Sequence, residues 1–294
     1  MTVAVKTLHP LFAAELTGLD LTRPLSPAEQ QAVTSAMDEH AVVAIPGQDF
    51  DNESQVAFSL QFGQLETAPM IRGKDGGGHR ISEHVFDASN LDENGRILAL
   101  DDDRRAYRDG NRQWHTDSSF RQRSATWSLL HARAIPPEGG DTLFADTRAA
   151  YDALPDGMKA RLEGLVAEHS IWYSRSTRGN YQPSAEELRA RPPAQHKLVR
   201  VHPGSGRKTL YIASHVSHIV GWPVEEGRAL IRELMAHATQ DRFVYRHAWR
   251  RHELVIWDNR CTMHAATPFD DVNYVRDMRR TTIIDPQWEI ADAA

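Results

Sequence analysis

Residues 253–264 read ELVIWDNRCTMH and contain an extended segment, a turn and a second extended segment. The apolar run 253–257, rich in β-branched and aromatic side chains, is typical of a buried strand. The polar triplet 258–260 predicts a turn, after which residues 261–264 run back as extended chain. Short strands that reverse direction at tight turns are typical of antiparallel sheets.

Similar short runs lie on either side of this segment. The predicted strands are 126–134, 142–145, 198–202, 209–213, 243–249 and 281–284. The predicted helices between them are 146–154, 158–165 and 224–239. Because the strands are not separated by one helix each, a parallel βαβ sheet is disfavoured. We expect a mainly β fold with peripheral helices, in which two antiparallel sheets form a jelly-roll barrel.

The amino-terminal third predicts two helices and two strands. Residues 8–21 alternate loosely and predict an early strand with a turn. Ser26, Pro27 and Glu29 form a capping box at the start of a helix. The apolar run 40–46 predicts a buried strand, and 52–62 predicts a second helix that ends at Gly63. Residues 64–112 lack such periodicity. We therefore expect one domain over residues 1–294 with a lid-like insertion at about 64–112; the alternative is a solvated insertion without a role.

Composition excludes several classes of protein. The 294 residues include 40% hydrophobic and 25% charged residues, which is a globular composition. The net charge of -6 argues against a nucleic-acid binder, and the single cysteine, Cys261, excludes an intrachain disulfide or a cysteine-built metal site. No signal peptide or membrane span is visible, so a cytoplasmic protein is expected. Arginine far outnumbers lysine, which favours small anionic ligands.

A candidate metal site begins at residues 114–117 (WHTD). On an extended strand, His115 and Asp117 project to the same side and can bind one ion. His264, from the second extended segment above, can supply a third ligand. Two histidines and one carboxylate form the facial triad of non-heme Fe(II) oxygenases. The alternatives are a polar pair at a strand end and a core histidine without a metal.

A candidate anion site follows His264 in the chain. If residues 273–284 are largely extended, Arg276 and Arg280 face the same side, and inside a barrel they would need anions. A dicarboxylate cosubstrate could pair its far carboxylate with Arg276. Thr142, after the turn at 139–141, could donate a hydroxyl to that anion. The alternatives are an ordinary turn and arginines on the outer face, paired with Asp270, Asp271 or Asp277.

In this order, the motifs resemble the Fe(II)/2-oxoglutarate-dependent dioxygenases related to taurine dioxygenase. The shared motifs are His115-x-Asp117, the segments 139–142 (GGDT) and 257–260 (WDNR), His264, and the pair Arg276 and Arg280. Segments 8–21, 148–155, 203–208 and 237–247 resemble the members that act on aryloxyacetates. The similarity extends from about residue 8 to 285 and is weakest in the lid.

This resemblance implies a double-stranded β-helix with Fe(II) held by His115, Asp117 and His264. It implies 2-oxoglutarate as cosubstrate, with Thr142 and Arg276 at its distal carboxylate and Arg280 near its iron-side carboxylate or the substrate. The residues that it implies for substrate binding are Asn111, His215 and, for the substrate carboxylate, Arg72 or Lys74 in the lid.

The expected reaction uses O2 to hydroxylate an aryloxyalkanoate such as 2,4-dichlorophenoxyacetate. The products would be a phenol and glyoxylate, together with succinate and CO2. Two alternatives are the same chemistry on taurine or another alkylsulfonate, and a non-catalytic barrel that binds a small acid. The expected partner is a small aromatic carboxylic acid, not nucleic acid or membrane, and the chain is expected to form a homo-oligomer.

Overall fold

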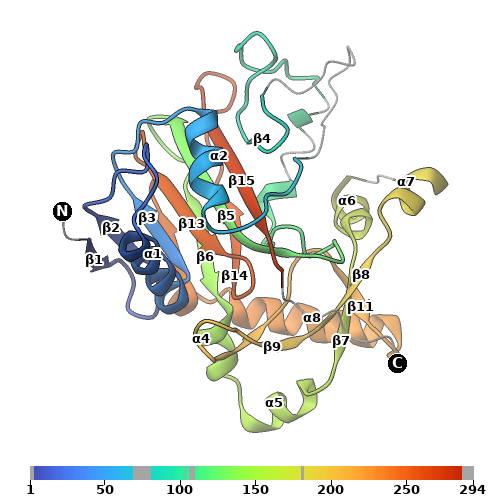
Figure 1. Cartoon of the computed structure of the whole chain (residues 1–294). Helices are drawn as coiled ribbons and strands as arrows, with labels where there is room; N and C mark the ends of the chain where they lie inside the picture. Colours follow the sequence, from blue (N-terminus) through green and yellow to red (C-terminus); the bar gives the residue numbers. More distant parts are fainter. Residues whose placement is uncertain (1–2, 69–80, 103, 106–109, 180–181, 287–294) are drawn as a thin grey trace.

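The computed structural model describes residues 3–68, 81–102, 104–105, 110–179 and 182–286. Its largest sheet has seven strands, in which only the β2–β3 pair is parallel. In spatial order they are β1 (Ala4–Thr7), β2 (Ala14–Thr17), β3 (Val42–Ile45), β13 (Leu254–Asp258), β5 (Ala125–Ala134), β15 (Asp277–Ile284) and β4 (Phe86–Asp87). In Figure 1 this sheet begins at the left with β1 and β2, and β4 lies to the right of β15.

The smaller sheets complete the β structure. One contains β12 (Val244–His247), β6 (Thr142–Asp146) and β14 (Thr262–Ala266). Another contains β11 (Val216–Ile219), β7 (Val166–His169) and β8 (Ala194–Lys197), and a hairpin joins β9 (Val199–Val201) to β10 (Lys208–Leu210). The predicted turn at 258–260 therefore carries the chain from β13 in the large sheet to β14 in a small one, as in a jelly roll.

The helices lie around these sheets (Figure 1). They are α1 (Pro27–His40), α2 (Asn52–Leu60), α4 (Thr147–Asp152), α5 (Asp156–Leu162), α6 (Ile171–Gly179), α7 (Ala185–Ala190) and α8 (Val224–Ala238), with 3-10 turns η1 (Gly110–Arg112) and η2 (Asp241–Phe243). The predicted capping box of α1 is present, since Ser26 accepts from the Glu29 amide and Glu29 from the Ser26 amide.

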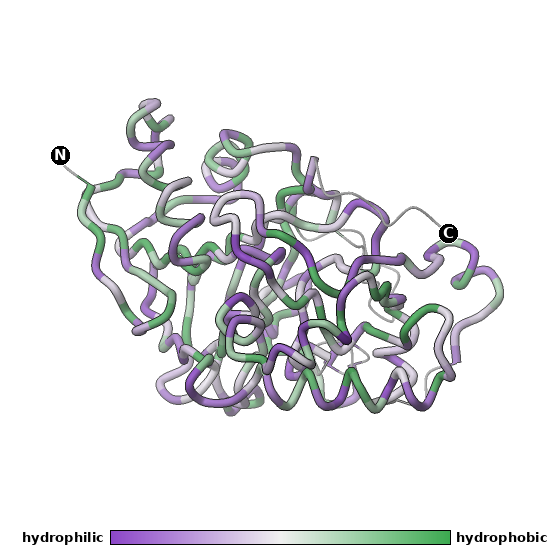
Figure 2. Tube along the Cα trace, turned by 90° about the horizontal axis from the view of Figure 1, so that it is seen from below, coloured by the Kyte–Doolittle hydropathy of each residue, from purple (hydrophilic) through white to green (hydrophobic). Residues whose placement is uncertain are grey.

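Strand alternation distributes the core over three layers. Leu254 and Ile256 of β13 pack with α1 and α2, whereas Val255 and Trp257 face Phe144 of β6 between the sheets. A third layer packs α8 against the small sheets. Figure 2 shows hydrophobic and hydrophilic segments interspersed along the chain. None of the helices in the described residues is long and apolar enough to cross a membrane.

The structure confirms the predicted mainly β fold, a double-stranded β-helix with peripheral helices. It differs from the sequence reading in detail. The strand expected over 273–284 begins only at Asp277, and β7, β8, β11, α6 and α7 were not predicted. Residues 69–80, 103 and 106–109 of the proposed lid are not among the described residues. In the described part of this segment, β4 pairs with β15.

Candidate active site

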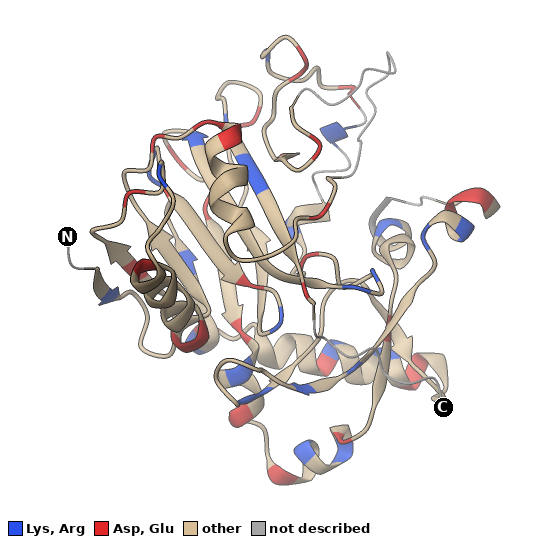
Figure 3. Cartoon of the chain, in the orientation of Figure 1, with Lys and Arg blue, Asp and Glu red and all other residues tan. Residues whose placement is uncertain are grey.

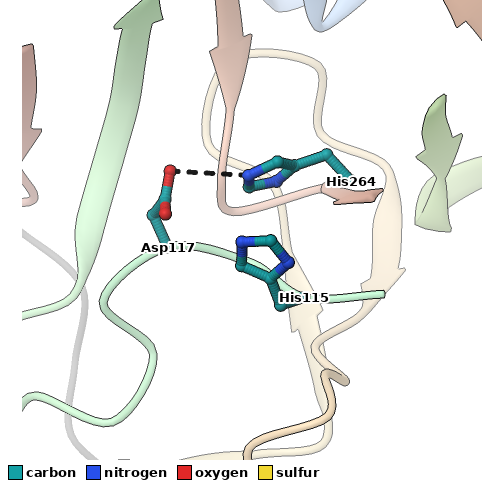
Figure 4. Close-up of side chains that lie close together, drawn as sticks. All are labelled: His115, Asp117 and His264. Carbon is teal, nitrogen blue, oxygen red and sulfur yellow. Dashed lines mark ion pairs between the residues drawn. The ribbon is translucent and has the colours of Figure 1, made fainter. Parts of the chain in front are cut away.

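Two backbone hydrogen bonds place the histidines of the predicted triad side by side. The His115 amide donates to the His264 carbonyl at 3.0 Å, and the His264 amide donates to the His115 carbonyl at 2.7 Å. The imidazole centroids are 4.1 Å apart. Asp117 projects to the same side, with its Oδ2 3.8 Å from His264 Nε2 (Figure 4). One ligand atom from each residue lies within 4.8 Å of the other two.

The two imidazoles are held in the form that binds metals. His115 Nδ1 lies 2.7 Å from the Gln113 carbonyl, which can only accept, so Nδ1 carries the proton and Nε2 keeps a lone pair. His264 packs against Trp257, with ring centroids 4.7 Å apart. Burial lowers the pKa of His115 and, more strongly, that of His264. Both rings are therefore neutral near pH 7, as metal ligation requires.

The Asp117 carboxylate is fixed on both oxygens. Ser128 Oγ donates to Oδ2 at 2.7 Å, and Arg280 donates to Oδ1 at 2.5 Å. Burial alone would raise the pKa of Asp117, but Arg280 and the two imidazoles hold it below its usual range. Neutral imidazoles and an ionised carboxylate at this spacing suit Fe(II), Mn(II) or Zn(II).

Asn259 is a supporting residue that the sequence analysis missed. Its Oδ1 accepts from the Trp257 indole at 3.0 Å and from the Asp117 amide at 3.1 Å. Its Nδ2 donates to Ser128 Oγ at 3.0 Å, and this hydroxyl holds Asp117. The amide therefore links β13, β5 and the Asp117 segment. The turn at 258–260 indicated a polar residue there but not its orientation.

A cavity, here called the inner cavity, adjoins the triad. His115 and Asp117 form part of its wall. Its other lining residues are Glu66, Phe86, Gly110, Asn111, Gln113, Ser118, Phe120, Arg121, Ile171, Ser174, Arg175, His215 and Arg280. The cavity therefore combines aromatic and aliphatic surfaces with arginines, a combination suited to a small aromatic acid.

The three described residues with a predicted substrate contact, Asn111, His215 and Arg280, all lie in this wall. The His215 ring meets Phe120 edge-on at 5.0 Å, and its Nδ1 is 2.9 Å from Ser174 Oγ. Burial lowers the pKa of His215 to about 3, so this ring is also neutral near pH 7. Arg72 and Lys74, the predicted lid cations, lie outside the described residues.

A second hollow, the outer cavity, shares Phe86 and Asn111 with the inner one and contains Arg276. Arg276 Nε donates to the Gly140 carbonyl at 3.2 Å. Burial lowers the pKa of Arg276 to about 10, so it remains a cation near pH 7. Among the described residues, no carboxylate lies within ion-pair distance of it. The guanidinium is therefore a candidate anion site.

The expectation that Arg276 and Arg280 share one side of a strand is wrong in detail. Arg276 precedes β15 and faces the outer cavity, whereas Arg280 lies within β15 and binds Asp117 beside the inner one. A register shift between Asp277 and Met278 breaks the strand alternation that the spacing assumed. Basic residues are visible on β15 in Figure 3.

Thr142 is on β6, as predicted, and is buried. Its hydroxyl accepts from the Trp249 indole at 3.0 Å and keeps its own proton for an acceptor. It is not among the residues that line either cavity.

Two further lining residues, Glu66 and Arg175, were not predicted. Glu66 Oε2 accepts from Ser118 Oγ at 2.9 Å, and burial raises its pKa. Arg175 is on α6, which the sequence did not reveal. Neither residue lies in a recognisable local motif, so only the three-dimensional arrangement brings them to the site.

A second group with metal-ligand chemistry, His202, Asp258 and Cys261, is not a comparable site. Asp258 Oδ2 already accepts from Arg260 at 2.6 Å, from the Trp127 indole at 3.0 Å and lies 3.1 Å from His202. The hydrogen bonds to this carboxylate stabilise the turn at 258–260 and leave it without a free position for a metal ion.

Comparison with known proteins gives the family. The profile described as "Taurine catabolism dioxygenase TauD, TfdA family" matches residues 4–282. The chain belongs to this family. It is 43% identical to an alpha-ketoglutarate-dependent 2,4-dichlorophenoxyacetate dioxygenase of Burkholderia sp. (strain RASC), over 97% of this chain and 95% of that protein. It is 42% identical to the protein of that name from Cupriavidus pinatubonensis, covering 97% of this chain and 99% of that one.

A crystal structure of AAD-2 in complex with Mn(II) and N-oxalylglycine superposes with a TM-score of 0.90, at 45% identity and 99% coverage of both chains. The TauD/TfdA chain described here is thus a dioxygenase whose fold is shared, over its full length, with a protein that binds a divalent metal.

Proposed function

We propose that this dioxygenase uses Fe(II), 2-oxoglutarate and O2 to hydroxylate an aryloxyalkanoate such as 2,4-dichlorophenoxyacetate. The products are a phenol and glyoxylate, with succinate and CO2. The observation that carries the proposal is the cluster of His115, Asp117 and His264, of which His115 and Asp117 lie in the wall of a cavity that also presents aromatic and cationic groups. The names of the relatives at 43% and 42% identity support the substrate.

The chain's own residues fit the metal and the cosubstrate. His115, Asp117 and His264 would hold Fe(II), which together with 2-oxoglutarate supplies the O2-activating chemistry when bound. Arg276 would pair with the far carboxylate, since it is a cation and, in the described part of the chain, no carboxylate lies within ion-pair distance of it. N-oxalylglycine, the ligand in AAD-2, differs from 2-oxoglutarate by NH in place of one CH2.

The cavity walls would orient the substrate and exclude water. Phe86, Phe120 and Ile171 would contact the aromatic ring, and Asn111 would contact its polar end. Hydroxylation of the carbon next to the ether oxygen gives a hemiacetal. Its breakdown cleaves the carbon–oxygen bond, passes the hydroxyl proton to the phenol and leaves glyoxylate.

An anaerobic titration tests this proposal. Fe(II) with 2-oxoglutarate should give a weak visible charge-transfer band, which His115→Ala abolishes and His40→Ala, a change at the end of α1, retains. In air, phenoxyacetates should stimulate succinate formation and release phenol in equal amount. Sulfite release from taurine without phenol release would favour the alkylsulfonate alternative, and ligand binding without succinate would indicate a non-catalytic barrel. The cytoplasmic location, the homo-oligomer and the lid over about 64–112 stay predictions.

A further inference from the structure

The backbone of Arg276 is held by one residue of the insertion, Asn90. The Arg276 amide donates to Asn90 Oδ1 at 2.8 Å, and the Arg276 carbonyl accepts from the Asn90 amide at 3.1 Å. β15 begins only at Asp277 and its register shifts before Met278, so the regular ladder of the sheet does not include Arg276. Both main-chain polar groups of the candidate cosubstrate cation are therefore paired with a single residue that is distant in the sequence.

The Asn90 side chain also holds the loop that leads to Arg276. Its Nδ2 donates one proton to the Asp271 carbonyl at 3.0 Å and the other to the Tyr274 carbonyl at 2.9 Å. Only 6% of Asn90 is exposed, so these contacts are shielded from water. An asparagine amide has two protons to donate and one oxygen that accepts. All three are used here on residues 271–276, so this side chain fixes the path of the loop.

The side chain of Arg276 is held separately, by the turn before β6. Arg276 Nε donates to the Gly140 carbonyl at 3.2 Å, and a Cβ atom built on Gly140 would lie 3.3 Å from Nε. The turn therefore lies directly against the guanidinium. Arg276 also lines the outer cavity. One contact on the backbone, from Asn90, and one on the side chain, from Gly140, thus set where the guanidinium meets this cavity.

A second contact ties the insertion to the same loop. Arg105 Nη2 donates to Asp271 Oδ1 at 2.8 Å, and Arg105 Nη1 donates to the Leu98 carbonyl at 3.2 Å. Both charged residues line the outer cavity. The Leu98 amide donates to the Asn90 carbonyl at 3.0 Å, which closes residues 90–98 into a loop. The insertion therefore supplies part of the wall of the outer cavity and is bonded at two places to the loop that carries Arg276.

We propose that Asn90 is a positioning residue for the cosubstrate, which places Arg276 to receive the far carboxylate of 2-oxoglutarate. This inference rests on the proposed function, in which Arg276 pairs with that carboxylate. It gives residues 90–98 of the insertion a role in the cosubstrate site. A guanidinium binds a carboxylate through two parallel N–H donors, so a displaced Arg276 backbone weakens the contact. Because linkage is reciprocal, binding of the carboxylate should in turn stabilise residues 90–98.

The test compares 2-oxoglutarate with 2-oxobutyrate, which keeps the 2-oxo acid end and lacks the far carboxylate. The affinities are measured on the Fe(II)-loaded protein without O2, through the charge-transfer band, so that no turnover is needed. Asn90→Ala should weaken the binding of 2-oxoglutarate by about 5- to 20-fold and that of 2-oxobutyrate by less than about twofold. In air, KM for 2-oxoglutarate should rise by a similar factor, and kcat should change by less than about threefold.

Asn94→Ala is the matched control, because Asn94 is an exposed asparagine in the turn of the same loop. It should leave the preference for 2-oxoglutarate over 2-oxobutyrate unchanged. Equal losses for the two acids in Asn90→Ala, or no loss for either, overturn the positioning role of Asn90 and leave the proposed function intact. A wild-type protein that binds the two acids equally overturns the pairing of Arg276 with the far carboxylate, and the role of Asn90 with it. A wild-type protein that gives no band with either acid overturns the proposed function.

A measurement on the wild type covers the case in which Asn90→Ala does not fold. N-oxalylglycine retains the far carboxylate. Added to the Mn(II)-loaded protein, it should slow amide hydrogen exchange in residues 90–98 and 271–276 together, by at least about threefold, whereas 2-oxobutyrate should not. If N-oxalylglycine leaves exchange in residues 90–98 unchanged, the coupling of this loop to the cosubstrate, and with it the role of Asn90, is wrong.

Discussion

Asn259 supports the proposed metal site without facing it. It accepts from Trp257 and the Asp117 amide and donates to Ser128. Asn259→Ala would leave these buried partners unsatisfied and free the Asp117 segment to move. We expect the affinity for Mn(II) to fall by about 10- to 100-fold. The free energy of unfolding should fall by about 2 kcal/mol. Metal titration and urea unfolding measure the two effects.

Asn273→Ala provides the comparison at an exposed asparagine, which donates to Asp270 at 2.8 Å in a surface turn. This change should alter neither the Mn(II) affinity nor, beyond about 0.5 kcal/mol, the stability. An Asn259→Ala protein that binds Mn(II) as tightly as wild type would show that Ser128 and Arg280 alone hold Asp117.

Asp258 should make stability depend on acid pH. Burial opposes its ionisation, but Arg260 and His202 hold the pKa of Asp258 well below its ordinary value of 3.8. Because the folded-state pKa is lowered, its contribution is present above the unfolded-state value and is lost as pH falls below about 4. Asp258→Asn should destabilise by about 3 kcal/mol at pH 7, since it leaves Arg260 buried without its anion.

Urea unfolding at a series of pH values from 7 to 3 tests this prediction. The difference between wild type and Asp258→Asn should shrink as the pH approaches 3, because the Asp258 carboxyl becomes protonated in the unfolded wild-type chain while it stays ionised in the folded protein. A difference that stays constant over this range would mean that Asp258 acts through packing alone.

At the scale of elements, the turn before β6 aligns Arg276. Gly139 has a φ of 71°, and a Cβ there would lie 2.5 Å from the Pro268 carbonyl oxygen. Gly139→Ala should therefore cost about 1–3 kcal/mol and displace the adjoining Gly140 carbonyl, to which Arg276 donates. We expect KM for 2-oxoglutarate to rise several-fold, with a smaller change in kcat.

Gly157→Ala is the matched control, because it makes the same glycine-to-alanine change at a position away from Arg276. Gly157 is in α5, and nothing lies within 4 Å of the position that its Cβ would take. Alanine there should be neutral or stabilise by up to about 1 kcal/mol. If Gly139→Ala behaves like Gly157→Ala in thermal unfolding and in KM for 2-oxoglutarate, the turn is not needed to place Arg276.

Elements whose side chains repeat with a clear period could be predicted from the sequence. The capping box at Ser26 and the alternation in β13 are local signals, and both are present. By contrast, α6 (IWYSRSTRG) contains β-branched, aromatic and serine residues with weak helix propensity. Its packing against β11 and η1 stabilises it, and local sequence does not record that packing. For the same reason the register shift after Asp277 was not foreseen.

In the candidate site, too, residues with a local sequence signal could be predicted and residues that depend on distant contacts could not. His115 and Asp117 could be placed together because they are two residues apart on extended chain, and the position of His264 followed from the motif order. Asn259 and Glu66 could not be assigned, since their roles depend on partners more than 50 positions away. Arg175 could not be assigned because its helix was not predicted. Sequence spacing can predict metal ligands that lie on the same extended segment. The residues that hold those ligands in place come from distant segments and depend on tertiary packing.

At the scale of the whole molecule, the proposed metal ligands lie where two sheets face each other. His264 is on β14 of a small sheet, whereas Ser128 and Arg280, which hold Asp117, are on β5 and β15 of the large one. A bound ion would therefore connect the sheets. The apolar layer of Phe144, Val255 and Trp257 also joins them, without any metal.

The fold should consequently survive removal of the metal but gain stability when it binds. Mn(II) at about 100 times its Kd should stabilise the protein by about 2.7 kcal/mol and raise Tm by roughly 5–10 °C. EDTA should return Tm to the metal-free value without unfolding at 25 °C, because the three apolar layers do not depend on the ion. His115→Ala should remove the Mn(II)-dependent shift, and His40→Ala should keep it. Unfolding by EDTA at 25 °C, measured by circular dichroism, would mean that the metal and not the apolar layer joins the sheets.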